Sequence, residues 1–130
     1  MKKKKPSPTE LAILKALWTK SPLTAKEIHA CIAKKLNWSF SSTRKTLDRM
    51  KAKAYLGCHT DRAEGVLVYK ARVSKVATLA YFAADFAKRV MEIDEPLPVS
   101  MFVDSKILNN AEQKELENLL ETLQSSENDE

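Results

Sequence analysis

Residues 40–53 carry polar and cationic side chains whose types and spacing suit contact with nucleic acid. Lysine and arginine bind phosphates and the O6 and N7 atoms of guanine, whereas serine hydroxyls bind phosphates or base edges. At helical spacing, one side of this segment presents small, polar and cationic residues. The candidates for base and near-backbone contacts are Ser41, Ser42, Arg44, Lys45 and Arg49. A solvated surface helix has the same pattern, so this segment alone does not establish DNA binding.

The histidine and cysteine residues do not indicate catalysis or metal binding. Cys31 falls among the apolar positions of its predicted helix, where we expect a small buried thiol, and His29 lies off that stripe, where we expect it to be solvated. Cys58 and His59 are adjacent, which places them on opposite faces of a strand, and no second pair follows at zinc-ligand spacing. The chain has no glycine-rich phosphate loop. We therefore predict a protein that is not an enzyme and that uses no metal and no cofactor.

Charge divides the 130-residue chain into two parts. Residues 1–75 hold 18 Lys and Arg against 5 Asp and Glu, a net charge of +13, whereas residues 76–130 hold 4 against 12, a net charge of −8. A strongly basic half favours a polyanionic partner, most commonly a phosphate backbone. No apolar run approaches the roughly 20 residues that span a bilayer, and the two cysteines lack C-x-x-C spacing. We expect a cytoplasmic protein with no membrane partner.

Three predicted helices would position the candidate residues. Residues 7–10 form a capping box with proline at the first helical position, and residues 24–27 form a second capping box. Ser39 is placed to cap a third helix that runs to about Lys53. The side of this third helix that we expect to face the core consists of Thr43, Leu47, Met50 and Ala54.

A β-hairpin is predicted after the third helix. Two stretches rich in β-branched and aromatic residues, Tyr55–Thr60 and Val66–Ala71, are joined by the polar turn Asp61–Gly65. The hairpin residues expected to face the helices are Leu56, Val66 and Val68. Two hairpin cations are expected to contact DNA phosphates, namely Arg62 at the tip and Lys70 near the far end.

This order of elements predicts the fold class: mainly α with a small β-hairpin. Three short helices and a hairpin, all within residues 1–73, are typical of a winged helix-turn-helix DNA-binding domain. The third helix would enter the major groove, and the hairpin would form the wing. We therefore expect a sequence-specific DNA-binding regulator. The alternative is a winged-helix adaptor that docks on a protein partner and does not read DNA.

Residues 74–130 are predicted to form a helical dimerisation region. One helix is expected from Ser74 to about Ile93, and its apolar residues recur at alternating steps of three and four, as in a coiled-coil seam. That seam consists of Val76, Leu79, Ala83, Phe86, Val90 and Ile93. A last helix is capped at residues 109–112, and an acidic, frayed tail is expected from Gln124. Its apolar stripe consists of Leu116, Leu119, Leu120 and Leu123.

Over most of its length the chain resembles the penicillinase repressor family of winged-helix transcriptional regulators. The likeness is strongest over residues 8–72, and it is carried by the order and spacing of several segments. These are Thr9–Trp18, Leu23–Ile28, Trp38-Ser39, Thr43, Leu47–Met50, Lys53 and Val68-Tyr69. The resemblance implies a homodimeric bacterial repressor that binds a palindromic operator and dimerises through its C-terminal helices.

Three departures from the family pattern limit what the resemblance implies. Ala54 stands where the family usually has glycine after the third helix, so the turn there is made without a residue that readily adopts a left-handed conformation. Met101-Phe102 stands where the antibiotic-responsive branch is cleaved between Asn and Phe, and the C-terminal cysteine cluster of the copper-responsive branch is missing. The sequence leaves open the inducing signal, the operator and the role of the lysine arm Lys2–Lys5.

Overall fold

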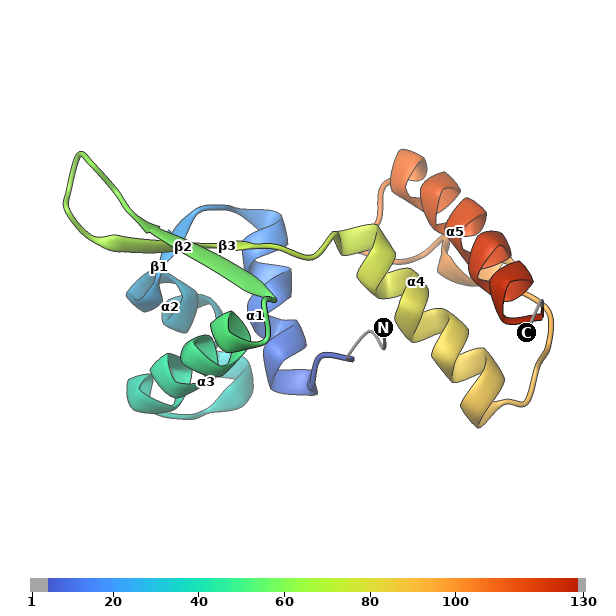
Figure 1. Ribbon diagram of the computed structural model, residues 1–130, viewed down its shortest axis with the longest axis horizontal. Helices are drawn as coiled ribbons and strands as arrows, with labels where there is room; N and C mark the ends of the chain where they lie inside the picture. The colour runs from blue at the N-terminus through green and yellow to red at the C-terminus, as the bar shows by residue number, and fades with distance from the viewer. Residues whose placement is uncertain (1–4, 129–130) are drawn as a thin grey trace. The chain divides into compact units, whose positions relative to one another are not determined.

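The computed structural model describes residues 5–128 of the chain. The chain divides into two compact units, an N-terminal unit that ends at Val73 and a C-terminal unit that begins at Ser74 (Figure 1). The elements of the N-terminal unit are α1 (Pro8–Thr19), β1 (Leu23–Thr24), α2 (Ala25–Leu36), α3 (Phe40–Ala52), β2 (Leu56–Thr60) and β3 (Leu67–Ala71). Those of the C-terminal unit are α4 (Lys75–Asp85), a π-helical turn (Phe86–Val90), a 3-10 turn (Val99–Phe102) and α5 (Asn110–Asn128).

The helices of the N-terminal unit begin where their caps predict. In the first capping box, the Ser7 hydroxyl accepts from the Glu10 amide at 3.2 Å and the Glu10 carboxylate accepts from the Ser7 amide at 2.8 Å. The box at residues 24–27 has the same two bonds before α2. Before α3, the Ser39 hydroxyl accepts from the Ser42 amide at 3.2 Å. These bonds satisfy amides that have no partner inside the helix, and they confirm the predicted helix starts.

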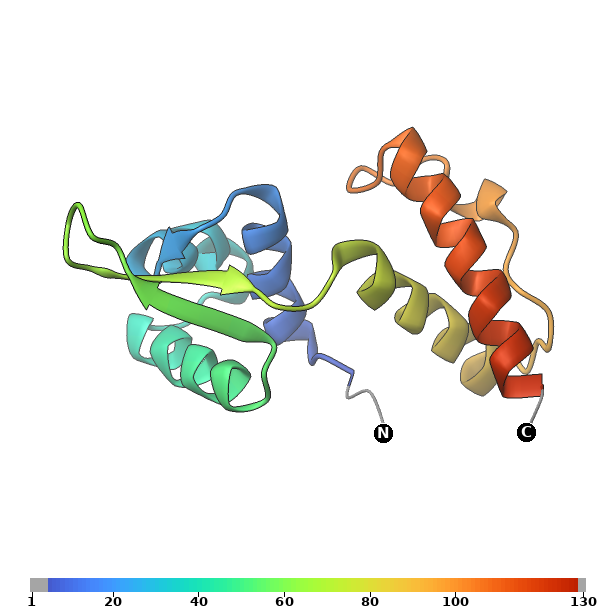
Figure 2. The same ribbon diagram turned by 45° about the horizontal axis from the view of Figure 1, so that its top comes forward.

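The sheet contains the predicted hairpin and one further strand. All three strands are antiparallel in the order β1-β3-β2, with Leu23 opposite Tyr69 and Gly57 opposite Lys70. Figure 2 shows the β2-β3 hairpin extending beyond the helices. The prediction that Val66 faces the helices was wrong: Val66 is exposed, because it precedes β3 and its carbonyl instead closes the hairpin turn by accepting from the Asp61 amide at 2.7 Å.

One core holds α1, α2, α3 and the sheet together. Its fully buried side chains include Ile13 and Leu14 of α1, Ile28 of α2, and Leu47 and Met50 of α3. The expected core side of α3 is therefore confirmed at Thr43, Leu47 and Met50. It was wrong at Ala54, which is exposed because α3 ends at Ala52.

Two expectations for α2 were wrong. Cys31 is exposed, because the apolar stripe of α2 passes through Ile28 and Ile32 and leaves Cys31 beside it. His29 is half-buried rather than solvated, since its Nδ1 lies 2.7 Å from the Thr43 hydroxyl and its ring contacts Phe40 edge to face. These contacts join α2 to the buried side of α3.

Ala54 makes the turn after α3 with a left-handed backbone. Its φ is +66°, and the chain reverses there with the Ala54 amide donating to Lys51 O at 3.0 Å and the Tyr55 amide donating to Met50 O at 2.9 Å. A non-glycine residue in this region is strained by contact between its Cβ and the backbone. Position 54 thus has the conformation that favours glycine, although alanine occupies it.

The C-terminal unit is built on α4 and α5, which lie side by side in Figures 1 and 2. Val76, Ala80 and Ala84 of α4 pack against Leu116 and Leu120 of α5 in a second core. At one end of this helix pair, the Lys75 ammonium lies 3.1 Å from Glu112, whose carboxylate also accepts from the Asn109 amide at 3.0 Å.

Two predicted bounds in the C-terminal unit were wrong. The first helix ends as a π-helical turn at Val90 instead of continuing to Ile93, because Glu92 adopts a φ of +55° and the chain reverses there. The last helix continues through the expected tail to Asn128, because its acidic residues do not interrupt the backbone ladder. Residues 129–130 of that predicted tail lie outside the described residues.

Candidate nucleic-acid interface

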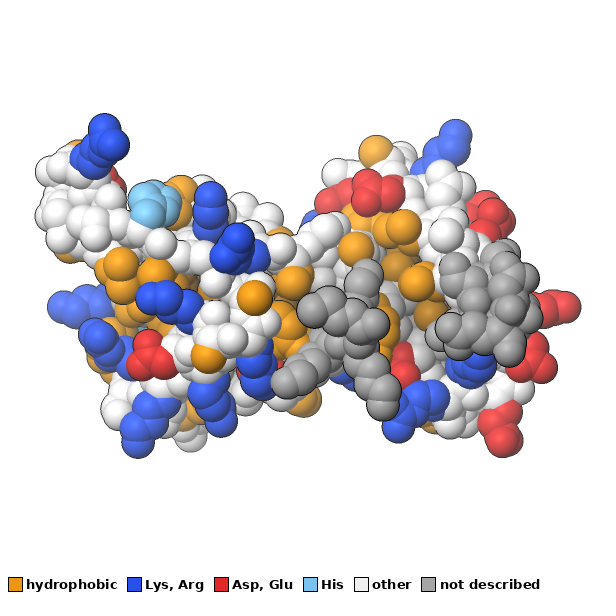
Figure 3. All heavy atoms as spheres, in the orientation of Figure 1, with side chains coloured by type: hydrophobic (Ala, Val, Ile, Leu, Met, Phe, Trp, Pro, Cys, Tyr) orange, Lys and Arg blue, Asp and Glu red, His pale blue; other side chains and the backbone are white. Residues whose placement is uncertain are grey.

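Helix α3 presents its candidate residues on one exposed side because its opposite side is anchored in the core. Ser41, Arg44, Lys45 and Arg49 are exposed, and Ser42 is half-buried. Figure 3 shows Lys and Arg side chains gathered over the N-terminal unit and few carboxylates among them. The arrangement places hydroxyl, ammonium and guanidinium groups on a single rigid element.

Two of the arginines on α3 have contacts that restrain them. The Arg44 guanidinium carbon lies 6.0 Å from the centre of the Phe40 ring, within the range of a cation-π contact. The Arg49 Nη2 donates to the Thr46 hydroxyl at 3.3 Å, and that hydroxyl donates to Ser42 O at 2.9 Å. Both arginines keep exposed charge at the surface.

The end of α3 is fixed to the start of α1 by an ion pair. The Lys53 Nζ lies 2.9 Å from the Glu10 Oε2, and Glu10 is only 2% exposed. Burial raises the pKa of Glu10, but the bonds from the Ser7 amide and from Lys53 outweigh it, so its pKa lies below the ordinary 4.5. Sequence reasoning assigned Glu10 to a cap and did not find this pair, because its members lie far apart in the chain.

The hairpin carries the two predicted wing cations, Arg62 and Lys70, and both are exposed. Lys70 also lines a shallow hollow at the edge of β2 together with two cations that sequence reasoning did not select, Lys51 and Arg72. A hydrogen bond to Cys58 raises the pKa of Lys51. Among the residues that the structure describes, no carboxylate lies within ion-pair distance of Lys51, Lys70 or Arg72.

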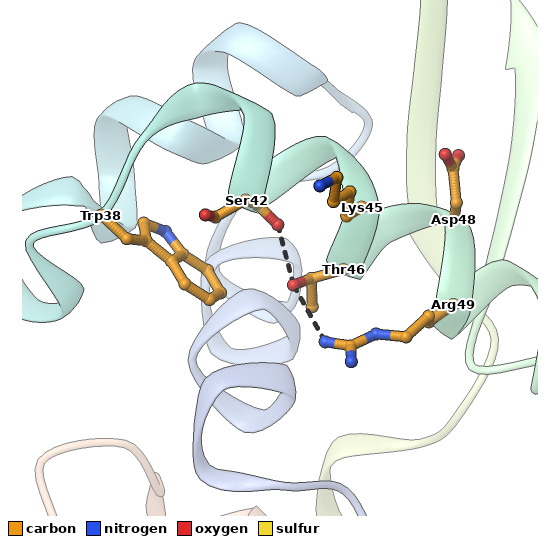
Figure 4. Close-up of a pocket in the computed structure, with 6 residues that line it drawn as sticks. All are labelled: Trp38, Ser42, Lys45, Thr46, Asp48 and Arg49. Atoms are coloured by element: carbon orange, nitrogen blue, oxygen red, sulfur yellow. Dashed lines mark hydrogen bonds between the residues drawn. The ribbon is translucent and has the colours of Figure 1, made fainter.

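A second hollow lies beside the first half of α3 (Figure 4). Its lining residues are Trp38, Ser42, Lys45, Thr46, Asp48 and Arg49. The indole Nε1–H of Trp38 is buried and has no hydrogen-bond partner among the described residues. Sequence reasoning did not select Trp38 as a site residue, because the sequence does not show whether an indole N–H has a partner.

The residues predicted for dimerisation fall into two groups. Phe86 and Val90 are exposed, by 47% and 64% respectively, and Leu79, Ala83 and Ile93 are half-buried. In contrast, Leu116 and Leu120 are buried between α5 and α4, and Leu119 and Leu123 pack partly against the same core. Val76 of the predicted seam also belongs to this core, so part of the seam is already covered within the chain.

The remaining predicted features are the lysine arm and the pair Met101-Phe102. Lys2–Lys4 of the lysine arm are outside them, and Lys5 is exposed. Met101 is exposed, whereas Phe102 packs against the second core. Within residues 5–128, no group of three or more His, Cys, Asp and Glu side chains is placed to hold a metal ion. No described helix is both long and apolar enough to cross a bilayer.

Comparison with protein families gives a match over most of the chain. The sequence model of a family described as penicillinase repressor matches residues 6–122, which covers both units. A search of curated proteins found no match.

Proposed function

Since this chain belongs to the penicillinase repressor family, whose members regulate transcription, we propose that it is a sequence-specific repressor that binds a palindromic DNA operator as a homodimer. The observation that carries the proposal is the exposed side of α3, where arginine, lysine and serine groups lie together on a helix anchored by a buried opposite face. A partner carrying regularly spaced phosphates and base-edge acceptors is complementary to that side.

In this proposal α3 enters the major groove of each half-site. Lys45 and Arg44 project far enough from the helix to reach guanine O6 and N7, and Ser41 is short enough to approach a base edge or phosphate closely. Ser42 and Arg49 contact the backbone or nearby bases. The wing adds phosphate contacts through Arg62 and Lys70, which contribute affinity without reading sequence.

The second copy binds through the exposed apolar positions of the C-terminal unit. Phe86 and Val90 present large apolar surfaces on the turn that ends α4. The half-buried Leu79, Ala83 and Ile93 would add their exposed parts to the interface. Leu116, Leu119, Leu120 and Leu123 support it from within the unit by holding α5 against α4. A two-fold dimer presents two α3 helices to half-sites about one helical turn apart, or a small multiple of it.

Selection of bound duplexes from a random pool tests the proposal. We expect an inverted repeat whose half-sites are spaced by about 10 bp or a small multiple. Sedimentation of the free protein is expected to show a dimer. Failure to bind any duplex at low salt, together with a monomeric protein, would overturn the proposal and favour a protein partner. Because the proposed ligand is chromosomal DNA, we place the protein in the cytoplasm.

A further inference from the structure

The hollow beside α3 contains a donor that the fold leaves unsatisfied. The Trp38 Nε1–H is buried and has no acceptor among residues 5–128. A buried donor without an acceptor destabilises a protein, so native structures rarely keep one that has no use. The chain holds a second tryptophan for comparison: Trp18 Nε1 donates to Val73 O at 3.1 Å. The missing acceptor is therefore specific to the site of Trp38.

The groups around Trp38 suit an anion. Figure 4 shows its ring under the first turns of α3, with Ser42 above it and the Arg49 guanidinium reaching back toward Thr46. Lys45 lines the same hollow, and the carboxylate of Asp48 points away from the other labelled groups. Apart from Asp48, the polar residues that line the hollow all carry hydrogen-bond donors: two cations, Lys45 and Arg49, and two hydroxyls, Ser42 and Thr46. The buried Trp38 N–H is a further donor in its wall.

Resting on the function proposed above, we propose that this hollow binds one phosphate of the DNA backbone, with the Trp38 indole N–H and the Arg49 guanidinium as its donors. The phosphates that border a major groove lie beside a helix inserted into it, which is where the hollow lies with respect to α3. Lys45 and Arg49 are exposed, and Arg49 is held by a single 3.3 Å bond to Thr46, so both side chains can rotate when the phosphate enters. Trp38 thus fixes the depth of α3 in the groove without reading a base.

The test compares Trp38→Phe with Trp18→Phe on two probes, the duplex selected from the random pool and an unrelated duplex. Trp38→Phe keeps an aromatic ring but removes the N–H together with part of the indole, and Trp18→Phe makes the same change at a tryptophan whose N–H is bonded. We expect Trp38→Phe to weaken binding to both duplexes equally, by about tenfold. The slope of log affinity against log salt stays unchanged, since a neutral donor releases no counterion, whereas Arg49→Ala reduces the slope by about one.

The stability of the two variants gives a matched control. Both substitutions remove the same ring atoms, but Trp38→Phe breaks no hydrogen bond, so its melting temperature is expected to fall less than that of Trp18→Phe. Trp18→Phe removes a formed hydrogen bond, so it is expected to lower the melting temperature and leave DNA affinity unchanged. A Trp38→Phe protein that binds like the wild type overturns the phosphate proposal, and so does a loss confined to the selected duplex.

A chemical substitution in the DNA locates the contact independently of folding. Each phosphate bordering a half-site is replaced in turn by a neutral methylphosphonate. At one of these positions we expect the wild type to lose affinity while Trp38→Phe loses markedly less, the sign of a shared interaction. Equal losses for both proteins at every position overturn the proposal. If the wild type binds the unmodified duplex, the proposed repressor function stands whatever the result for Trp38. If the wild type does not bind it, the proposed function itself fails.

Discussion

The Nζ of Lys53, at the C-cap of α3, lies 2.9 Å from the Oε2 of Glu10, in the first turn of α1. Glu10 uses its other oxygen to accept from the Ser7 amide at 2.8 Å, so one buried carboxylate both caps α1 and holds the end of α3. Helix α3 is thereby oriented by a charge pair outside the hydrophobic core. The stability of the folded protein should therefore depend on the charge of Glu10.

Replacing Glu10 tests that dependence. Because the pKa of Glu10 is lowered on folding, its carboxylate stabilises the protein above its unfolded pKa of about 4.5, and this stability is lost as the pH falls through the lower folded pKa. We expect Glu10→Gln to reduce the free energy of unfolding by about 1–2 kcal/mol near pH 7, less than for a fully buried pair because Lys53 is partly exposed. Urea denaturation of both proteins measures this difference in the free energy of unfolding.

The same comparison in acid, below the lowered pKa of Glu10, identifies the cause. Protonated Glu10 is close in shape and charge to glutamine, so the wild type and Glu10→Gln should converge in stability there. Glu64→Gln, at an exposed hairpin position, serves as the control and should match the wild type at both pH values. A difference for Glu10→Gln that persists unchanged in acid would show that packing, and not charge, is responsible.

Ala54→Gly should stabilise the protein. Ala54 has a φ of +66°, a conformation that glycine adopts without the Cβ contact. We expect the free energy of unfolding to rise by about 1 kcal/mol, the strain of a left-handed alanine less the added chain entropy of glycine. The control is Ala30→Gly at an exposed position within α2, which should lower it by about 1 kcal/mol. If both substitutions destabilised the protein equally, the claim that Ala54 is strained would be wrong.

The features that sequence reasoning found are those fixed by neighbours in the chain. Capping boxes at residues 7–10 and 24–27 need only a side chain and an amide three residues apart, and the hairpin needs only two apolar stretches and a turn. The exposed side of α3 follows from helical periodicity once Leu47 and Met50 are assigned to the core.

The features that sequence reasoning missed depend on contacts between residues far apart in the chain. Strand β1 is two residues long and exists because Leu23 and Thr24 meet Tyr69 and Val68. His29 finds its partner Thr43 only when α2 packs on α3. The unsatisfied indole of Trp38 is likewise invisible in the sequence, since Trp18 is the same residue type with a satisfied N–H.

Two lysines on the N-terminal unit should differ in what they contribute to DNA binding. We expect Lys45→Ala, on the exposed side of α3, to weaken binding to the selected duplex by about 10- to 100-fold and to affect random DNA much less. Lys70→Ala, on the wing, should weaken both duplexes about equally and reduce the salt slope by about one. Gel-shift titrations over a range of salt measure both effects. Equal losses on both duplexes for Lys45→Ala would remove it from the base-reading residues.

Phe86→Asp should separate the proposed dimer without unfolding either unit. Phe86 is 47% exposed on the turn after α4, outside the core formed by Val76, Ala80, Leu116 and Leu120, so an aspartate there meets water in a monomer and an apolar surface in a dimer. Sedimentation should show a monomer, and circular dichroism should show unchanged helix content. Operator affinity should fall steeply because two half-sites no longer bind as one unit. Val66→Asp, at an exposed apolar position on the hairpin, is the control and should stay dimeric. A Phe86→Asp protein that sediments as a dimer would exclude this surface as the interface.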